Sequence, residues 1–582
     1  MAGTVRLNAR FLRTFFIVLA IISFFIPAWV ATQTVFCDAY VHRRIAVASW
    51  YRSWRSLPRE EGLYRGTLDP NVVANQSPYP SLTRKLGCGE LEGLDLAVSS
   101  FGESAECVGF PHPPLGSYET LGLSATRCMS DRVRYEPYRS LQSDLYNGSA
   151  AERWDDVDLA RLQRDCRILD DGRPMATSQG DLDESEVPRE SPKRPRTAVI
   201  LRGWNGFRWT EDDMQNVRAM VTELAMFSGG EYELFVLLHL RNATQAVPLP
   251  GETLENVKLR YVPKALVNMT ELWTYIDVET TYPKVGEHDV YYHTFMPVQL
   301  FAARHPEIDF FWNWEMDVRY TGHYGELFSA LTEWASKQST TGLWARNTRF
   351  YIPSFHGSYN GFADAAVRAD VHAPAPTPWI NVDDESVDGV GSEADFITLF
   401  PMFDTSNTLW PHKDYLVNYQ ISEVEHRYGT VGTNVRLSRK LLEMMHRENV
   451  AGRAMMSEMF PPTLAFHHGL KAVFAPHPMF LDRRWPVENL QKTFNGGNRG
   501  QVEGSMASVI NHEQDFEGAT WYWNSQYTLD LYRRWLGMAE EGPGSTEVSP
   551  RVPIQPPAIA DSPFSGRGPM ARYACRQCCF TP

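Results

Sequence analysis

The feature that constrains the fold most is a strand–helix–strand pattern in the first half of the chain. Residues 197–201 (TAVIL) and 234–238 (LFVLL) are short, continuous apolar runs, which are typical of buried strands. Between them, Thr210 and Asp213 have the spacing of a helix capping box, and apolar residues recur at helical spacing over residues 214–227. Two buried strands joined by a helix predict a βαβ unit, and therefore an α/β fold with a parallel sheet covered on both faces.

The same alternation continues at lower contrast further along the chain. Residues 298–304 favour a helix, and residues 309–312 (DFFW) favour an aromatic strand. Two more helices are predicted, over about residues 435–447 and 528–536. We therefore expect one α/β domain over residues 197–538, with a Rossmann-like, mostly parallel sheet flanked by helices.

An apolar run over residues 14–36 distinguishes the N-terminus. About 20 apolar residues are enough to cross a membrane. Arginines precede the run, which favours a cytoplasmic tail over residues 1–13 and a type II orientation. The alternative is a cleaved signal peptide, but the run is longer than an ordinary signal core and lacks a good cleavage site. We expect an uncleaved transmembrane signal anchor, with the rest of the chain in the lumen of the secretory pathway.

Two further patterns agree with export. The sequence contains N-x-Ser/Thr triplets, which are acceptor sites for N-glycosylation, at Asn75, Asn147, Asn242 and Asn268. None of the eight cysteines lies between Cys166 and Cys575. Clusters at the two ends predict disulfides formed in an oxidising compartment. For the C-x-x-C-C sequence over residues 575–579, a zinc site remains open as an alternative.

Composition divides the remaining segments. Residues 37–168 are rich in Gly, Pro, Ser and Tyr, which indicates a luminal stem or subdomain held by disulfides. Residues 169–196 are charged and contain four prolines but no aromatic residue, so we expect a disordered linker. Residues 539–582 form a Pro- and Gly-rich tail. The net charge of −14 argues against a general nucleic-acid binder, whose affinity depends on Lys and Arg.

Two acidic residues follow the predicted aromatic strand. Glu315 and Asp317 are two residues apart, and in extended backbone such side chains point the same way. Ligands of open α/β sheets bind beyond the carboxyl ends of the strands, and carboxylates at that position suit Mn²⁺ or Mg²⁺. The alternative is a surface loop in which both acids are solvated beside Arg319.

The segment HPEIDFFWNWEMDV, residues 305–318, carries a resemblance. It resembles the metal-binding strand of GT-A glycosyltransferases and is locally similar to fungal α-mannosyltransferases of the Kre2/Mnt1 type. Met316 stands where those enzymes have a proline between the two acids. Over residues 197–535 the chain resembles a fungal family of type II membrane proteins known only as domain of unknown function 3405. The matching segments are TAVILRGW, TELAMFSGGEYELFVLLHL, EMDVRYTGHYGELF, EADFITLFPMFD and GLKAVFAPHP.

The GT-A resemblance implies an enzyme that transfers a sugar from a nucleotide-sugar donor to a glycan or glycoprotein acceptor in the Golgi or endoplasmic reticulum. It implies a hexosyltransferase, with mannose as one candidate sugar. It further implies a Mn²⁺ (or Mg²⁺) cofactor held by Glu315 and Asp317, which would bind the donor together with Arg202. A cation there would offset the charge that develops on the leaving diphosphate.

GT-A enzymes commonly complete the metal site with a histidine late in the fold. His477 is the first candidate, because it follows an apolar strand predicted over residues 471–475; His467 and His468 are its rivals. A further carboxylate near the acceptor would act as a base or stabilise the reacting sugar. The candidates for this role are Glu393, Asp395 and Glu458. Glu458 can equally be an acid near a helix N-terminus.

Two other classes of function compete with this interpretation. The first is a non-catalytic luminal protein, in which a GT-A-like domain serves as a lectin or an assembly partner. The feature that distinguishes this protein from an enzyme is whether Glu315, Asp317 and His477 come close enough together to bind one metal ion. The second is a metal-dependent hydrolase, which is less favoured because the sequence has no H-E-x-x-H motif.

Overall fold

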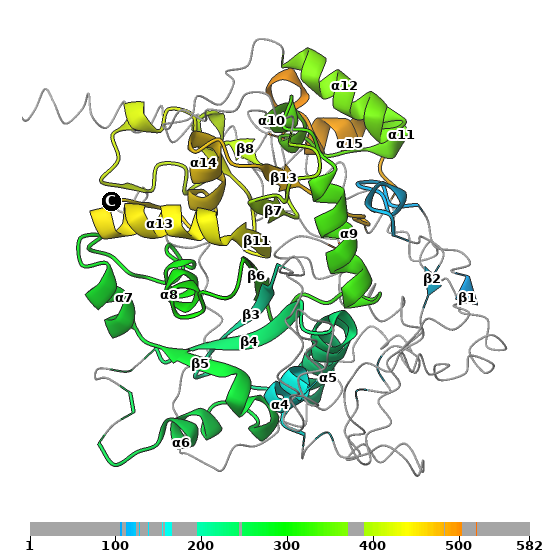
Figure 1. Cartoon of the computed structure of the whole chain (residues 1–582). Coiled ribbons are helices and arrows are strands. Elements are labelled where there is room, and N and C mark those ends of the chain that lie inside the picture. Colours follow the sequence, from blue (N-terminus) through cyan, green and yellow to red (C-terminus); the bar gives the residue numbers. More distant parts are fainter. Residues whose placement is uncertain are drawn as a thin grey trace, which may run out of the picture. The chain divides into compact units, whose positions relative to one another are not determined.

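The computed structural model describes residues 105–106, 112–123, 127–128, 135, 138, 154, 157–165, 195–241, 243, 247–248, 250–370, 389–481, 484–502 and 520 (Figure 1). The apolar run over residues 14–36, the predicted helix over residues 528–536 and the C-x-x-C-C sequence lie outside them. In the described residues, no helix is both long and apolar enough to span a membrane.

A seven-stranded sheet forms the centre of the described domain, with the strand order β13-β7-β11-β6-β3-β4-β5. Strand β11 runs antiparallel to both of its neighbours, and the other pairings are parallel. The mixed α/β class with a mostly parallel sheet is therefore confirmed. The strands are β3 (Thr197–Trp204), β4 (Tyr232–His239), β5 (Thr270–Trp273), β6 (Phe310–Glu315), β7 (Phe396–Thr398), β11 (Val435–Ser438) and β13 (Ala472–Phe474).

The predicted βαβ unit is present. Thr210 caps helix α5 (Glu211–Met220), and Asp213 completes the capping box. The helix continues as a π-helical segment (Val221–Met226), so that its apolar residues stay against the sheet. Strands β3 and β4 pair in parallel along their whole length.

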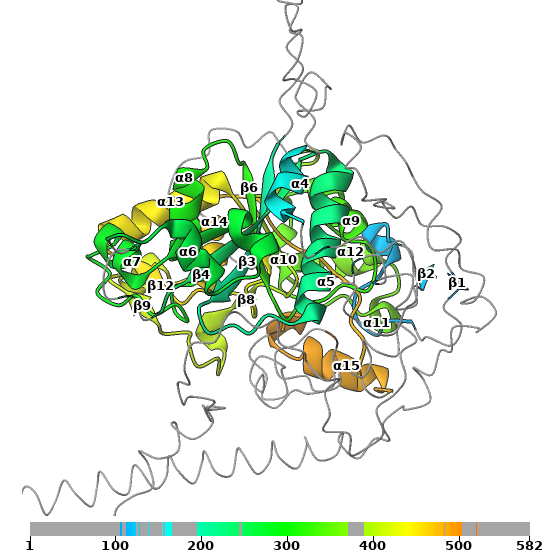
Figure 2. The same ribbon diagram turned by 90° about the horizontal axis from the view of Figure 1, so that it is seen from below.

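Helices cover both faces of the sheet (Figures 1 and 2). Phe328 of α9 contacts Trp312 on the face that also carries α5, whereas Phe301 of α8 contacts Phe235 and Phe311 on the other face, where α8 packs on α13. The remaining helices are α4 (Leu159–Asp165), α6 (Leu254–Leu259), α7 (Tyr275–Thr281), α8 (Met296–Arg304), α9 (Tyr324–Ser336), α10 (Leu343–Asn347), α11 (Pro353–His356), α12 (Tyr359–Ala369), α13 (Arg439–Ala451), α14 (Phe460–His467) and α15 (Val487–Phe494).

Three short strand pairs and several 3₁₀ turns complete the described elements. The pairs are β1 (Ala105–Glu106) with β2 (Arg127–Cys128), β8 (Phe403–Asp404) with β10 (Tyr428–Gly429), and β9 (Leu416–Val417) with β12 (Ala454–Met455). The 3₁₀ turns are Glu119–Leu121, Lys264–Met269, Thr405–Asn407, Ile421–Glu423 and Asn498–Gly500.

One predicted helix is partly wrong. Residues 435–447 were expected to be helical, but residues 435–438 form strand β11 and α13 begins only at Arg439. The side chain of Ser438 accepts from the Leu441 N–H and so caps α13. Pairing with β6 and β7 outweighs the helical spacing of the apolar residues, because β11 fills the gap between these two strands.

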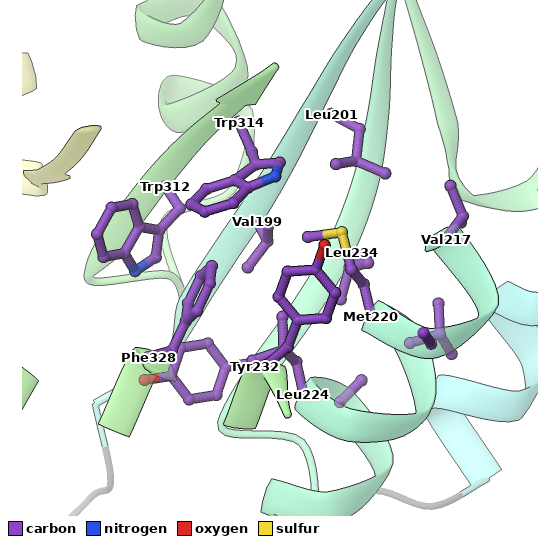
Figure 3. Packing of buried hydrophobic residues seen from close by; sticks show 14 of the residues in the cluster. Val199, Leu201, Val217, Met220, Leu224, Tyr232, Leu234, Trp312, Trp314 and Phe328 are labelled. Atoms are coloured by element: carbon purple, nitrogen blue, oxygen red, sulfur yellow. The ribbon is translucent and has the colours of Figure 1, made fainter. Parts of the chain in front are cut away.

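Figure 3 shows why the sheet is apolar on the α5 and α9 side. Val199 and Leu201 alternate along β3 and are in register with Trp312 and Trp314 of β6. Phe328 of α9 packs against both tryptophans. Alternate strand residues point to the opposite face, which is also buried, under α8, but carries Arg202 and Glu315 where β3 and β6 reach their carboxyl ends.

Residues before the sheet domain also belong to this fold. Gln163 of α4 donates to the Leu234 carbonyl at 3.2 Å and accepts from the Leu234 N–H at 2.7 Å. The side-chain amide therefore pairs with β4 as a neighbouring strand would. It does so at Leu234, before the residues of β4 that pair with the short strand β5. The Gly116 N–H donates to the Tyr351 carbonyl at 2.8 Å, and Leu115 forms a β-bridge with Met479.

This contact of the early segment generates a stability prediction. Gly116 and Gly122 both have positive φ values, of 70° and 73°. A Cβ atom on Gly116 would lie 1.9 Å from the carbonyl oxygen of His477, whereas one on Gly122 would meet nothing within 4 Å. Both alanine substitutions incur about 1–2 kcal/mol for left-handed backbone. We expect Gly116→Ala to lower the free energy of unfolding by about a further 1–3 kcal/mol, because it also forces a backbone overlap.

Denaturant titration of the two single variants measures this difference. Gly122→Ala serves as the matched control, because it shares the backbone penalty and lacks the overlap. Equal losses of stability in the two variants would contradict the docking of residues 115–117 against the His477 loop.

Candidate functional site

The strand register places several polar and aromatic side chains on one face of the sheet, along the edge formed by the carboxyl ends of the strands. Arg202 of β3 is paired with Glu315 of β6, Trp204 of β3 with His239 of β4, and His239 with Trp273 of β5. Residues in register, and residues two apart in one strand, project from the same face. All five therefore lie at the carboxyl ends of their strands, on the face opposite the core of Figure 3.

The border between β3 and β6 is the point where the order of the strands reverses. The chain passes from β3 outward through β4 to β5, and then returns to place β6 on the other side of β3. In open α/β sheets, ligands bind beyond the carboxyl ends of the strands at this switch point. Arg202 and Glu315 occupy this position.

Five residues form what we call the Arg202 cluster: Arg202, Glu315, Asp317, Thr433 and Asn434. The Arg202 guanidinium donates to Glu315 Oε1 at 2.8 Å and to Thr433 Oγ1 at 2.7 Å. The Thr433 hydroxyl donates to Glu315 Oε1 at 2.5 Å, and Asn434 Nδ2 donates to Glu315 Oε2 at 3.1 Å. The Glu315 N–H donates to Asn434 Oδ1 at 2.8 Å. Glu315 is thus held by the residues that immediately precede β11.

Asp317 differs from Glu315 in its surroundings. Strand β6 ends at Glu315, and Asp317 lies in a turn closed by the Val318 N–H and the Glu315 carbonyl. The extended geometry predicted for the pair is therefore lost after Glu315. The pKa of the exposed Asp317 carboxyl is raised, because nearby protein displaces some of its water and because Glu315 carries like charge. The cations Arg319 and Arg202 oppose this rise in pKa.

Burial also acts on Arg202. Desolvation lowers the pKa of the Arg202 guanidinium, and the charges of Glu315 and Asp317 oppose that shift. An arginine keeps its proton in proteins even so. The cluster therefore combines one cation with two carboxylates, and the second carboxylate lacks a full counter-charge.

Glu458 is the one candidate catalytic carboxylate that approaches this cluster. Its Oε1 accepts from the Gly432 N–H at 2.6 Å, and its backbone carbonyl accepts from the Thr430 N–H at 2.9 Å. Gly432 is next to Thr433 in the chain. Glu458 therefore supports the loop that carries Thr433 and Asn434, two residues before α14 begins at Phe460.

Glu393 and Asp395 do not join the site. Both precede β7, and β6 and β7 run in the same direction because each is antiparallel to β11. They consequently lie at the amino edge of the sheet, opposite the edge that carries Glu315. There Glu393 accepts from Arg436 at 2.5 Å, and Asp395 Oδ1 accepts from the Ser438 hydroxyl at 2.7 Å. Both contacts stabilise the end of β11.

His477 also lies away from Asp317. It follows β13, which is separated from β6 by β7 and β11, so the required adjacency of the two strands is absent. Its ring nitrogens face the carbonyls of Leu399, at 2.9 Å, and Pro478, at 3.2 Å. Burial lowers the pKa of His477 to about 4.

The rival histidines lie elsewhere as well. His467 is buried at the end of α14 and contacts the His426 carbonyl at 2.8 Å, and His468 follows it. Across the described part of the chain, no three His, Cys, Asp or Glu side chains gather in a way that could hold a metal ion. In those residues the structure thus offers the Glu315 and Asp317 pair without a histidine.

Of the predicted glycosylation sites, Asn268 is described. Its side chain is exposed, and Nδ2 donates to Asp158 Oδ2 at 2.7 Å. Asn75, Asn147 and Asn242 lie outside the described residues.

The profile of one known family, described as "Protein of unknown function (DUF3405)", matches residues 118–556. The chain belongs to this family. The match covers all seven strands of the central sheet and every member of the Arg202 cluster. A search of curated proteins and a search of solved structures found no match.

Sequence reasoning missed several residues that this DUF3405 member places at the sheet edge. Thr433 and Asn434 went unnoticed because the segment that follows them was assigned to a helix. Had Val435 been recognised as the start of a strand beside β6, its preceding polar residues would have become candidates. Trp204 and His239 were missed because the apolar runs were ended too early, at residues 201 and 238.

The hydroxyl of Thr433 generates the second prediction. Thr433→Val removes a group that contacts both Arg202 and Glu315, and the shape of the side chain is kept. Hydrogen bonds to charged groups contribute about 1.5–3 kcal/mol, so we expect a loss of about 2 kcal/mol in the free energy of unfolding. Thr433→Ser is the control, because it keeps the hydroxyl. Denaturant titration showing the serine variant to be as unstable as the valine variant would contradict the role of Oγ1.

Proposed function

We propose that this DUF3405 member is a metal-dependent glycosyltransferase that uses a nucleotide-sugar donor and a glycan or glycoprotein acceptor. The observation that carries the proposal is the position of Arg202, Glu315 and Asp317 at the switch point between β3 and β6. A cation and two acids at this position suit a diphosphate and the divalent ion that accompanies it.

The topology supports the same function. Numbered along the chain, the strands lie in the order 3-2-1-4-6-5-7, and the sixth is antiparallel. The first part, 3-2-1-4, is that of doubly wound nucleotide-binding sheets. The fourth strand, β6, belongs to the segment over residues 305–318, which resembles the metal-binding strand of GT-A glycosyltransferases.

Glu315 and Asp317 could both bind a divalent ion, but they differ in how far their oxygens are already engaged. Both Glu315 oxygens already accept hydrogen bonds, from Arg202, Thr433 and Asn434. Asp317 is exposed, and its raised pKa marks a carboxylate that a nearby cation would stabilise. We assign Asp317 as the principal protein ligand and Glu315 as the residue that orients Arg202. Such an ion would supply positive charge to the leaving diphosphate.

Arg202 and Glu458 would contribute to the reaction in different ways. Arg202 is fixed by Glu315 and Thr433, so its charge is oriented before a donor arrives, and fixed charge stabilises a leaving group well. The Glu458 carboxylate accepts a hydrogen bond from the Gly432 N–H. In the proposed enzyme it positions the Thr433 loop, and its carboxylate is the described candidate for accepting a proton from an acceptor hydroxyl.

The proposed cellular location depends on the N-terminal apolar run. The apolar run over residues 14–36 and the arginines before it support a type II membrane protein of the Golgi or endoplasmic reticulum. The sequons and the cysteine distribution support the lumen as the compartment of the domain.

A second candidate function is a non-catalytic lectin or assembly protein of the lumen. It is favoured by one observation, namely that both oxygens of the Glu315 carboxylate already accept hydrogen bonds from neighbouring side chains. The two candidates differ in whether binding of a nucleoside diphosphate depends on a divalent cation.

The third prediction tests this dependence. Calorimetric titration of the protein with uridine and guanosine diphosphates should show binding with Mn²⁺ and little without it. Asp317→Asn should lower the Mn²⁺-dependent affinity by about 100-fold, because it removes a charge beside a dication. Glu333→Gln is the matched control, since it removes an exposed acid on α9. Unchanged affinity in Asp317→Asn would rule out this residue as a ligand.

The fourth prediction concerns pH. Because the pKa of Asp317 is raised, this carboxyl takes up a proton at a higher pH than an ordinary aspartate. A divalent ion binds the deprotonated form, so Mn²⁺ affinity should fall as the pH is lowered through that raised pKa. The titration of Mn²⁺ at a series of pH values measures this. In Asp317→Asn the acid-side decrease should disappear, and its persistence would assign the decrease to another group.

A further inference from the structure

His239 is a buried imidazole whose hydrogen bonding is incomplete. Its side chain is 3% exposed, and it stacks on Trp273 with ring centroids 3.8 Å apart and Tyr275 at its edge. Within the described residues, Nε2 is buried and has no hydrogen-bond partner. Leaving a buried polar atom unpaired is unfavourable. A buried group of this kind needs an explanation, and a ligand atom is one.

The imidazole is neutral at physiological pH. Burial lowers the pKa of His239 to about 4, and the charge of Arg241 acts in the same direction, whereas Asp289 opposes it. A neutral imidazole has one N–H donor and one nitrogen acceptor. It suits the donor and acceptor atoms at the edge of a nucleobase.

Trp204 lies directly beside His239 and is exposed to solvent. Its side chain is 43% exposed, although it is a large apolar group at the end of a central strand. The indole is nonetheless held in place. Arg241 lies over the ring at 5.1 Å from its centroid, and a Cβ on Gly206 would lie 2.0 Å from a ring carbon. A fixed, exposed indole provides a flat surface on which a planar ligand can stack.

The distance from the Arg202 cluster fits a nucleotide. Trp204 follows Arg202 by two residues in the same strand and projects from the same face. Two residues of strand span about 6.6 Å, which is roughly the distance from the diphosphate of a nucleotide across its ribose to the base. His239 is one strand further from Glu315.

From these positions we infer that Trp204 and His239 bind the base of a nucleoside diphosphate whose phosphates lie at the Arg202 cluster. The base stacks on the Trp204 indole, and its edge supplies the partner of His239 Nε2. This inference rests on the proposed function, since it takes the phosphates to bind at Arg202 and Asp317. It adds a base-recognition subsite formed by β3 and β4, which neither the acidic pair nor the local resemblance indicates.

The experiment compares nucleoside diphosphates with inorganic pyrophosphate, both in the presence of Mn²⁺. Pyrophosphate reports the phosphate site alone, and the difference between the two affinities reports the contribution of the base. In the native protein we expect uridine or guanosine diphosphate to bind more tightly than pyrophosphate. Trp204→Ala should weaken binding of the nucleoside diphosphate at least about fivefold, since the base loses the aromatic ring on which it stacks.

His239→Ala should weaken binding of the same nucleoside diphosphate by about two- to tenfold, as expected for the loss of one hydrogen bond. Both variants should keep the pyrophosphate affinity of the native protein. Phe355→Ala on α11 is the matched control for Trp204→Ala, because Phe355 is also an exposed aromatic, at 51%. Melting temperatures check folding, and Trp204→Ala alone decides the question if the buried His239 variant is unstable.

The outcomes separate this inference from the proposed function. If pyrophosphate and the nucleoside diphosphates bind the native protein equally, or if the Trp204 variant keeps its nucleotide affinity, the base subsite is overturned and the phosphate site stands. Trp204 would then serve another ligand, such as an acceptor sugar. If affinities for both ligands fall together, the two residues act only on the fold, and the subsite is again overturned. If neither ligand binds the native protein, the proposed function fails and the subsite fails with it.

Discussion

The parallel register between β3 and β6 determines where every residue of the candidate site can lie. Because Leu201 is paired with Trp314, Arg202 must be paired with Glu315, and the two charged residues must point away from the aromatic core. A shift of one residue in β6 would turn Glu315 toward Phe328 and would turn the two tryptophans toward the side covered by α8. The apolar packing of one face therefore selects the ion pair on the other. Few sequences can satisfy both faces at once, and this makes the register specific.

The charges of the Arg202 cluster are only partly balanced. Arg202 makes close contacts with Glu315 but acts on Asp317 without a described hydrogen bond, and Asp317 is left with a raised pKa. A carboxylate that is difficult to ionise in the free protein is a stability cost unless a positively charged ligand offsets it. The imbalance at Asp317 therefore favours a binding role over a structural one.

Local patterns were enough to predict the elements that depend on neighbours in sequence. The capping box of Thr210 and the apolar runs of β3 and β4 needed no tertiary information, and the βαβ unit followed from them. The acidic pair was found for the same reason, since it directly follows an aromatic strand. Strand β11 was mistaken for helix because four residues are too few to show a period of two, and its pairing partners lie far away in sequence.

Long-range contacts account for the remaining differences. The assignment of His477 depended on which strand lies beside β6, and strand order is not contained in any local pattern. The loop of His477 is instead covered by residues 115–117, from a segment that the composition assigned to a stem. Gln163 likewise pairs with β4 although it lies before the predicted linker. In each case the deciding partner is more than 70 residues away.

Interactions between distant segments also link residues around this edge of the sheet. His239 is next to Trp204 through the strand register, and Asp289 lies close enough to His239 to affect its pKa. Asp289 accepts from the Tyr291 N–H at 2.8 Å. The Tyr291 carbonyl accepts from the Ser457 hydroxyl at 3.1 Å, which places Ser457 and its neighbour Glu458 on this path.

Glu458 holds Gly432, and Thr433 beside it returns to Glu315 and Arg202. These hydrogen bonds join segments separated by more than 200 residues, since Arg202 and Thr433 are 231 apart. A side chain held from two directions has few alternative rotamers, so its polar atoms are in position before a ligand arrives. Such preorganisation reduces the entropy lost on binding. It also explains why the polar residues of this edge are drawn from β3, β4, β6 and the loop before β11: one segment alone could not hold them on all sides.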